Sequence, residues 1–323
     1  MIKDNVKLFW SSENITSKST SAGLFVLIAD NFLKIHENST VYGCALVENQ
    51  VKHIAIKNRK DLFRLQGSKY VQSNLTHVFL NVKEDLENGK NVLFSGTACQ
   101  ISAIKAYLKQ DYQNLMTIDI VCHGVPSPEF FDYYLSYLTQ KYKGEIQDFR
   151  FRNKSKTNRH GYIISFSVNG KKKNIYPNED VYYNAFLEGK SLRPSCYKCR
   201  YANKKRVSDI SIGDSNNSLF HKNEAISLAI INSAKGNDLF KLVQQNGEIK
   251  DTQYSIESAS NRQLSQAAKK PRNRDVFYKI LRNMGVEYVA PACSIKSRVL
   301  IRVKNSIPTV IKNEAKELLK MIR

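Results

Sequence analysis

Two consecutive stretches of this 323-residue chain share one pattern, in which an apolar strand runs into a cysteine-bearing turn and then into a helix. Residues 91–95 form the first apolar strand, Cys99 stands in the turn, and apolar residues then recur at helical spacing. Residues 115–121 repeat the strand, and Cys122 stands in the next turn, before a second predicted helix. Successive strand–turn–helix units imply parallel strands joined by right-handed crossovers. The pattern therefore predicts an α/β protein.

The rest of the chain divides by pattern around this doubled unit. Residues 1–18 are polar and unpatterned, and residues 19–145 are expected to form an α/β N-terminal domain. Residues 146–250 are typical of a smaller α+β domain, because strand-like runs joined by an Asn-Gly hairpin turn lead into short helices. Residues 251–323 predict a helix-rich basic tail. We expect a mixed sheet with two consecutive β-turn-α units, a smaller α+β portion and a helical C-terminus.

Composition limits the class of protein and its location. Hydrophobic residues make up 42% and charged residues 24% of the chain, as in folded globular proteins. The longest uninterrupted apolar run, residues 22–29, is too short to span a bilayer, and the first residues lack the shape of a signal peptide. We therefore expect a cytoplasmic protein, in which the six cysteines stay reduced and available to a metal.

The chain is strongly basic, with 50 Lys and Arg against 29 Asp and Glu and a formal net charge of +21. Such a surplus favours anionic partners, among them phosphorylated cofactors, acidic proteins and lipid headgroups. Nucleic acid is not expected, because the sequence shows neither a recognisable module nor basic residues interleaved with exposed aromatics. Residues 296–323 contain eight basic and two acidic residues, which is compatible with peripheral contact with an anionic membrane.

A Cys-x-x-Cys pair, Cys196 and Cys199, adds two thiols to those of the doubled unit. Because ligands gather beyond the carboxyl ends of parallel strands, Cys99 and Cys122 should face one region. Backbone N–H groups and helix dipoles at that edge are expected to lower the pKa of their thiols. Four thiolates from three segments are what an iron–sulfur cluster or a zinc ion requires.

The sequence leaves the nature of such a metal site open. One cysteine pair with two isolated cysteines favours iron–sulfur, since zinc ribbons usually bring two pairs. The alternative is that Cys99 and Cys122 are buried core residues and that the pair is incidental. The two remaining cysteines, Cys44 and Cys293, lack a comparable context and are interpreted as core or incidental.

Three other polar motifs are candidates for contact with an anionic ligand, each with a structural alternative. Residues 19–23 stand at a predicted helix N-terminus, where they can bind a phosphate or simply cap the helix. Residues 67–70, with the sequence Gly-Ser-Lys-Tyr, have suitable side chains but no specificity by themselves. His123 can hydrogen-bond a cofactor or cap a turn.

Taken together, these segments resemble the beta subunit family of coenzyme F420 hydrogenase/dehydrogenase, in order and spacing, across about residues 19–240. The segments that carry the resemblance are GSKYVQS at 67–73, LFSGTACQI at 93–101, DIVCHGVPSP at 119–128, FRNK at 151–154, LRPSCYKC at 192–199 and SDISIGD at 208–214.

The resemblance implies an oxidoreductase or electron-transfer subunit with FAD and one [4Fe–4S] cluster, and with coenzyme F420 or another organic molecule as hydride acceptor. The implied cluster ligands are Cys99, Cys122, Cys196 and Cys199. The residues implied to contact flavin or substrate are Ser19, Thr20, Ser21, Gly23, Gly67, Ser68, Lys69, Tyr70, Thr97, His123 and Asp214.

The chain also departs from the family pattern. Many members carry an N-terminal ferredoxin-like segment with its own cysteines, whereas residues 1–18 contain none, so a separate electron-donor protein is expected. Ala98 replaces the usual proline before the first cysteine, and residues 215–217 replace an aromatic-rich stretch. Relatives also occur near genes for surface polysaccharides, which makes such a pathway one setting for the reaction. The alternative is a non-catalytic binding or scaffold protein whose fold is stabilised by a bound cluster or zinc ion.

Overall fold

The computed structural model describes residues 5–155, 158–177, 179–215 and 226–289. Strands of the larger sheet are β1 (Val6–Ser11), β2 (Ser39–Val47), β3 (Gln50–Ile56), β4 (Asn91–Thr97), β5 (Leu115–Ile120), β9 (Ile210–Ser215), β10 (Ile226–Ile231) and β11 (Gly247–Thr252). Strands of the smaller sheet are β6 (Gln147–Ser155), β7 (Asn158–Val168) and β8 (Lys171–Ile175). The larger sheet has the order β11-β1-β10-β9-β5-β4-β2-β3, and the smaller one β6-β7-β8.

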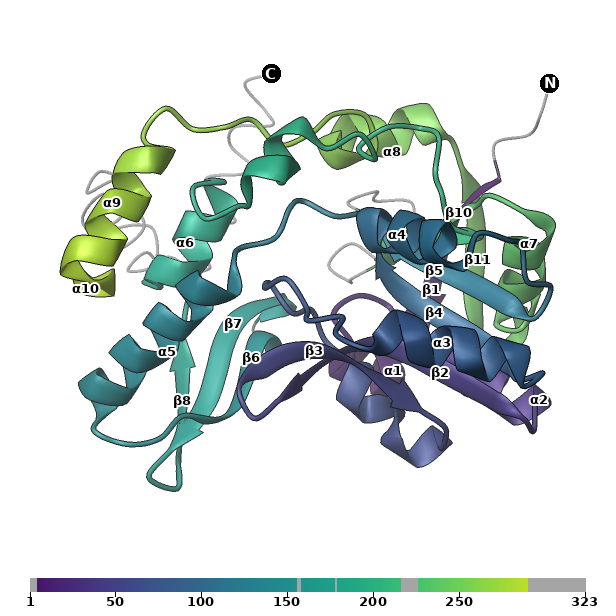
Figure 1. Ribbon diagram of the computed structural model, residues 1–323, viewed down its shortest axis with the longest axis horizontal. Helices are drawn as coiled ribbons and strands as arrows, with labels where there is room; N and C mark the ends of the chain where they lie inside the picture. Colours follow the sequence, from purple (N-terminus) through teal and green to yellow (C-terminus); the bar gives the residue numbers. More distant parts are fainter. Residues whose placement is uncertain (1–4, 156–157, 178, 216–225, 290–323) are drawn as a thin grey trace, which may run out of the picture.

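The middle of the larger sheet is parallel. Strands β2, β4, β5 and β9 run in one direction, and the strands outside them pair antiparallel. Thus β4 and β5, the strands of the doubled unit, lie side by side and end at the same edge (Figure 1). The α/β prediction and its two β-turn-α units are confirmed.

Helices cover both faces of this sheet. One face packs against α2 (Leu24–Ile35), the 3₁₀ helix η1 (Arg59–Leu65) and α7 (Ala234–Lys241), and the other against α3 (Val78–Glu87), α4 (Ala98–Leu108), α8 (Tyr254–Ser260) and the 3₁₀ helix η4 (Arg262–Leu264). Because side chains alternate along a strand, neighbouring residues enter different cores: Val41 belongs to the first and Tyr42 to the second.

A separate, aromatic-rich core lies beside the smaller sheet, at the left of Figure 1. Its helices are α5 (Pro128–Tyr142), α6 (Val181–Leu187), α9 (Arg274–Met284) and α10 (Val286–Val289). Phe130 and Tyr182 stack there with ring centroids 4.6 Å apart. The α5 helix begins as its sequence predicts, with the Ser127 hydroxyl accepting the N–H of Phe130 at 3.3 Å and proline at the first helical position. These aromatic contacts hold the smaller sheet and its helices together.

The N-terminal segment differs from the sequence expectation. Residues 1–18 were expected to be polar and unpatterned, yet β1 pairs with both β10 and β11, and α1 (Glu13–Lys18) follows it. Val6, Leu8 and Phe9 are buried in this strand. Its six residues are too few for a clear period, and its pairing partners lie more than two hundred residues away, so the sheet determines its conformation.

Two further 3₁₀ helices complete the described elements, η2 (Pro194–Lys198) and η3 (Gln244–Asn246). Among the described residues, no helix combines the length and apolar character needed to cross a bilayer. Cys293 and the basic segment 296–323 lie outside the described residues.

Candidate functional site

A cavity of about 460 Å³ opens at the carboxyl ends of the parallel strands. Every polar residue that the resemblance implied as a flavin or substrate contact lines this cavity: Ser19, Thr20, Ser21, Gly23, Gly67, Ser68, Lys69, Tyr70, Thr97, His123 and Asp214. The residues come from segments up to about two hundred positions apart, so the fold alone brings them together. Their roles toward a ligand stay predictions.

The hydroxyl segment at residues 19–23 and the loop at residues 67–70 are joined directly. The Thr20 hydroxyl oxygen accepts the backbone N–H of Ser68 at 2.9 Å. The Ser21 hydroxyl donates to the backbone oxygen of Ile226 at 2.8 Å, and is thus used to attach this segment to β10. These side chains of residues 19–23 therefore serve the scaffold, but they do not cap the helix: Gly23 is the N-cap of α2, and no side chain caps it.

Lys69 holds its own loop in place. Its Nζ donates to the backbone oxygens of Leu65 at 3.0 Å and Gln66 at 2.9 Å. Burial lowers the pKa of Lys69 to about 8, and a nearby negative charge on Cys44 would oppose that shift. Cys44, interpreted from sequence as core or incidental, packs against the aromatic-rich core beside the smaller sheet and also lines the cavity. Lys69 is therefore a buried cation whose charge is sensitive to mildly alkaline pH.

Asp214 and His123 both line the cavity, and both interact with Arg152. The Arg152 guanidinium donates to Asp214 Oδ2 at 2.7 Å, and the Arg152 side chain is only 5% exposed. Burial lowers the pKa of His123, as does the charge of Arg152, whereas Asp214 raises it. His123 is therefore a neutral imidazole at pH 7, able to donate one hydrogen bond and accept another.

The four cysteines surround a smaller cavity of about 50 Å³ that adjoins the large one. Cys99, Cys122 and Cys196 line both cavities, and Cys199 lines the smaller one. The thiol of Cys99 is exposed and the other three are half-buried. The structure thus gathers the predicted thiols from three segments at one place, next to the polar cavity.

The pKa of Cys122 differs from the sequence expectation. Burial raises the pKa of Cys122 to about 12 and also raises that of Cys196, despite the hydrogen bond that Cys122 Sγ accepts from the N–H of Gly124 at 3.3 Å. Cys122 also lies several residues before α5, so it gains nothing from a helix N-terminus. Both groups are thiols at neutral pH, and a metal would have to displace their protons.

Gly124 allows the two cysteine segments to pack closely. Its φ is +100°, and a Cβ there would lie 2.7 Å from Leu192 Cδ1 and 3.3 Å from Cys196 Cβ. The N–H of Arg193 donates to the backbone oxygen of Val125 at 3.0 Å, which joins the same two segments. Only glycine fits this position without moving Cys196.

Within the described residues, no group of three or more His, Cys, Asp or Glu side chains is placed to hold a metal ion. The ligands of a [4Fe–4S] cluster have a different requirement, because each thiolate binds its own iron and the four surround the cluster. Four thiols around one small cavity fit that donor set in chemistry and in number.

Comparison with known proteins places the chain in a family. Residues 89–256, more than half of the chain, match the family described as the C terminus of the coenzyme F420 hydrogenase/dehydrogenase beta subunit. The chain belongs to the coenzyme F420 hydrogenase/dehydrogenase beta subunit family. A chain of the F420-reducing [NiFe] hydrogenase complex from Methanosarcina barkeri is similar in fold, with a TM-score of 0.52 and 16% identity over 81% of this chain and 90% of that one. No curated protein matches the chain.

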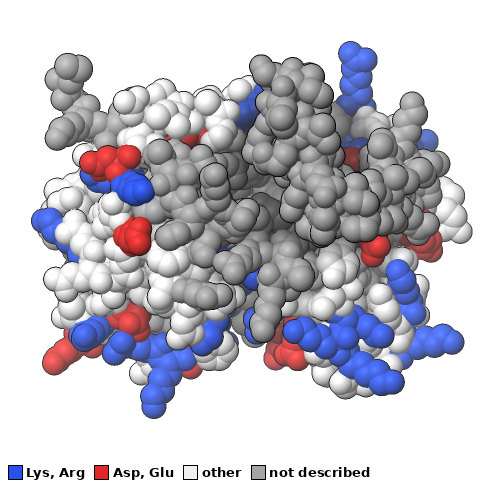
Figure 2. Space-filling view, turned by 180° about the vertical axis from the view of Figure 1, so that it is seen from behind, with Lys and Arg blue, Asp and Glu red and all other residues white. Residues whose placement is uncertain are grey.

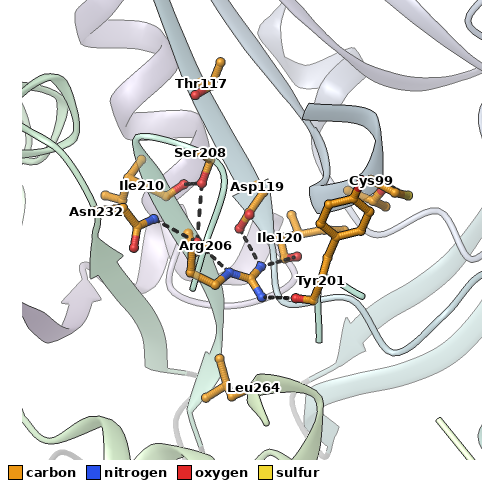
Figure 3. Close-up of polar contacts among 12 residues, drawn as sticks. Cys99, Thr117, Asp119, Ile120, Tyr201, Arg206, Ser208, Ile210, Asn232 and Leu264 are labelled. Atoms are coloured by element: carbon orange, nitrogen blue, oxygen red, sulfur yellow. Dashed lines mark hydrogen bonds and ion pairs between the residues drawn. The ribbon is translucent and has the colours of Figure 1, made fainter. Parts of the chain in front are cut away.

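This F420 hydrogenase beta subunit family member contains one polar cluster that sequence reasoning missed. Arg206, whose side chain is 2% exposed, donates to Oδ1 of the fully buried Asp119 at 2.7 Å (Figure 3). The guanidinium also donates to the backbone oxygen of Tyr201 at 3.1 Å and to the Ser211 hydroxyl at 3.0 Å. The sequence carried no signal for it, because the partners lie on separate segments and Arg206 looks like one of many surface cations.

Proposed function

We propose that this protein is an iron–sulfur flavoprotein that moves electrons between a separate donor protein, a [4Fe–4S] cluster, FAD and an organic hydride acceptor. One observation carries the proposal: the predicted polar contacts line one cavity, and four cysteines surround a second cavity that shares its wall. Family membership supports a redox role. We retain the cytoplasm as the expected location.

In this proposal Cys99, Cys122, Cys196 and Cys199 hold the cluster, and the large cavity holds FAD. A volume of about 460 Å³ lies in the range of cofactor pockets, which are typically roughly 300–1,000 Å³. When bound, a cluster exchanges single electrons, and a flavin exchanges single electrons or a hydride. The short separation between the two cavities is what electron transfer between such groups needs.

The residues of the large cavity would bind and orient the flavin. Those backbone N–H groups and hydroxyls of residues 19–23 and 67–70 that the scaffold contacts do not use suit a diphosphate, and the buried Lys69 adds a positive charge. Neutral His123 can hydrogen-bond a flavin ring or the acceptor, which would be coenzyme F420 or another organic molecule, including one in a surface-polysaccharide pathway.

Purification without oxygen tests this proposal. We expect a brown protein with four irons, matching sulfide and one flavin per chain, measured by the visible spectrum and by iron, sulfide, zinc and flavin assays. Zinc alone, or a cluster without flavin, would reject the proposal and favour a metal-stapled binding or scaffold protein.

The charge of Lys69 predicts how FAD binding depends on pH. Because the pKa of Lys69 is about 8, the group is cationic at pH 7 and loses its charge as the pH rises to 9. We expect FAD affinity to fall about tenfold over that interval, since one proton changes binding by at most about a factor of ten per pH unit. Lys69→Met should bind FAD more weakly at pH 7 and show little of this pH dependence, measured by fluorescence titration of flavin-free protein.

Unfolding cannot explain such a loss of affinity. The folded pKa of Lys69 lies below its ordinary value of 10.5, so between about pH 8 and 10.5 the unfolded chain binds more protons. The flavin-free fold therefore gains stability from this group as the pH rises. The control is Lys171→Met on the exposed end of β8, which should keep the wild-type pH profile. If Lys69→Met showed the wild-type pH dependence of FAD affinity, Lys69 would not be the group that controls this dependence.

The electron donor is proposed to be a small acidic redox protein. Two segments that line the cysteine cavity carry basic residues without a single acidic one: residues 193–206 contain six and residues 262–274 contain five. The exposed thiol of Cys99 lies at the same cavity. Lys and Arg also gather elsewhere, for example along the lower edge of the face in Figure 2, where Asp and Glu lie between them. The flanks of the cysteine cavity keep a basic surplus, although Asp275 pairs with Lys270 and Arg274.

Charge reversal beside the cavity is expected to slow reduction by an acidic ferredoxin. Lys205→Glu combined with Lys269→Glu changes one exposed residue on each flank and should lower the second-order rate at low salt about tenfold, with little difference at high salt. Lys171→Glu combined with Lys172→Glu makes the same charge change at the distant start of β8 and should have little effect (Figure 1). Stopped-flow absorbance measures both rates. Equal slowing in the two variants would show that net charge alone is responsible.

A further inference from the structure

Arg206 joins the two chain segments that carry Cys122 and Cys199. Its partner Asp119 lies on β5, three residues before Cys122, and its partner Tyr201 follows Cys199 by two residues. The contact with Ser211 attaches the same guanidinium to β9. One buried side chain thus links a strand end, a loop and a neighbouring strand.

The position of Arg206 relates this link to the cysteine cavity. Arg206 lines the smaller cavity together with all four cysteines. No described helix or strand covers residues 199–209, so backbone pairing within such an element does not hold the loop after Cys199. At the far end of this loop the backbone N–H of Asp209 donates to the backbone oxygen of Thr117 on β5 at 3.1 Å. Nearer Cys199, the loop is joined to the end of β5 through the guanidinium, which contacts the backbone oxygens of Tyr201 at 3.1 Å and Ile120 at 3.4 Å.

The buried ion pair between Asp119 and Arg206 is not explained well by a contribution to the stability of the fold. Burying both charges removes them from water, and replacing a buried ion pair by apolar residues of similar size is often neutral or stabilising. The Asp119 and Arg206 side chains are 0% and 2% exposed, so this desolvation applies to both. What an apolar pair cannot reproduce is the fork of N–H groups that fixes the loop relative to the strand end.

We propose that Arg206 is a positioning residue for the cluster, which holds the loop of Cys199 at the separation from Cys122 that cluster binding requires. The inference rests on the proposed function, because it concerns the same four thiols. Outer partners of metal ligands commonly affect metal retention by about 10–100-fold.

The test separates cluster retention from folding. The double variant Asp119→Leu/Arg206→Met replaces the ion pair by apolar side chains, and we expect a cluster-free protein with near wild-type thermal unfolding. When cluster-loaded, it should lose its visible absorbance to an iron chelator about 10–100-fold faster than the wild type. Arg206→Lys keeps the positive charge but not the fork of N–H groups. Its rate of cluster loss should lie between the rates of the wild type and the double variant. The EPR spectrum of the reduced cluster should also broaden or shift in the double variant.

The matched control is Asp85→Leu/Lys90→Met, which removes an ion pair of 2.6 Å at the opposite end of β4. Its rate of cluster loss should equal that of the wild type. Unchanged loss in Asp119→Leu/Arg206→Met, or equal acceleration in the control, overturns the inference about Arg206. A wild-type protein that binds no cluster when reconstituted with iron and sulfide rejects the proposed function and this inference together.

Discussion

Cys196→Ser is expected to abolish cluster occupancy and, with it, electron transfer from donor to flavin. Cys196 lines both cavities, so it stands in the wall between the proposed cluster and the proposed flavin. A serine hydroxyl at this half-buried position does not supply the thiolate that iron requires. We expect iron and sulfide near zero after anaerobic purification, loss of the brown colour, and no flavin reduction by the donor. Circular dichroism should still show a folded protein.

The control substitution for this prediction is Cys44→Ala. Cys44 lines the large cavity but not the smaller one, so cluster content should equal that of the wild type. Cys293→Ser, outside the described residues, is likewise expected to leave the cluster unchanged. Equal loss of iron in Cys196→Ser and Cys44→Ala would refute the ligand assignment, as would a full complement of iron in Cys196→Ser.

The centre of the fold could be predicted from sequence because its signals are local. Each parallel strand of the doubled unit is a short apolar run with a helix close behind it, and α5 begins with Ser-Pro-Glu. Since parallel strands end at one edge of a sheet, the convergence of Cys99 and Cys122 followed from this pattern. The structure brings both thiols to one cavity with the Cys-x-x-Cys pair.

The features that sequence reasoning missed depend on contacts between distant residues. Strand β11 contains a single apolar side chain, that of Ile249, and is defined by pairing with β1, so its sequence has no clear period of its own. The burial of Arg206 against Asp119 joins positions 87 residues apart. The raised pKa of Cys122 likewise follows from burial, which no spacing of cysteines reveals.

Gly236→Ala is expected to destabilise the fold by about 3 kcal/mol, at the upper end of overpacking costs. Gly236 lies inside α7, which begins at Ala234. Helix propensity would then favour alanine by about 1 kcal/mol. The packing predicts the opposite sign, because a Cβ on Gly236 would lie 1.9 Å from the backbone oxygen of Asp209.

The clash cannot be relieved by a side-chain movement, since the first turn of α7 is tied to Asp209. The Ser233 hydroxyl donates to Asp209 Oδ1 at 2.7 Å and accepts the N–H of Gly236 at 3.1 Å, while Asp209 Oδ2 accepts the N–H of Thr117 on β5 at 2.8 Å. Alanine would therefore push α7 away from β9, the strand that carries Asp214 to the large cavity, and should weaken FAD binding as well.

Denaturant unfolding measures the change in the free energy of unfolding. The control is Gly89→Ala, because a Cβ on Gly89 would have no atom within 4 Å. This control should cost only about 1–2 kcal/mol, for the left-handed φ of Gly89. A Gly236→Ala protein as stable as the wild type would show that α7 and β9 are packed less tightly than these contacts imply.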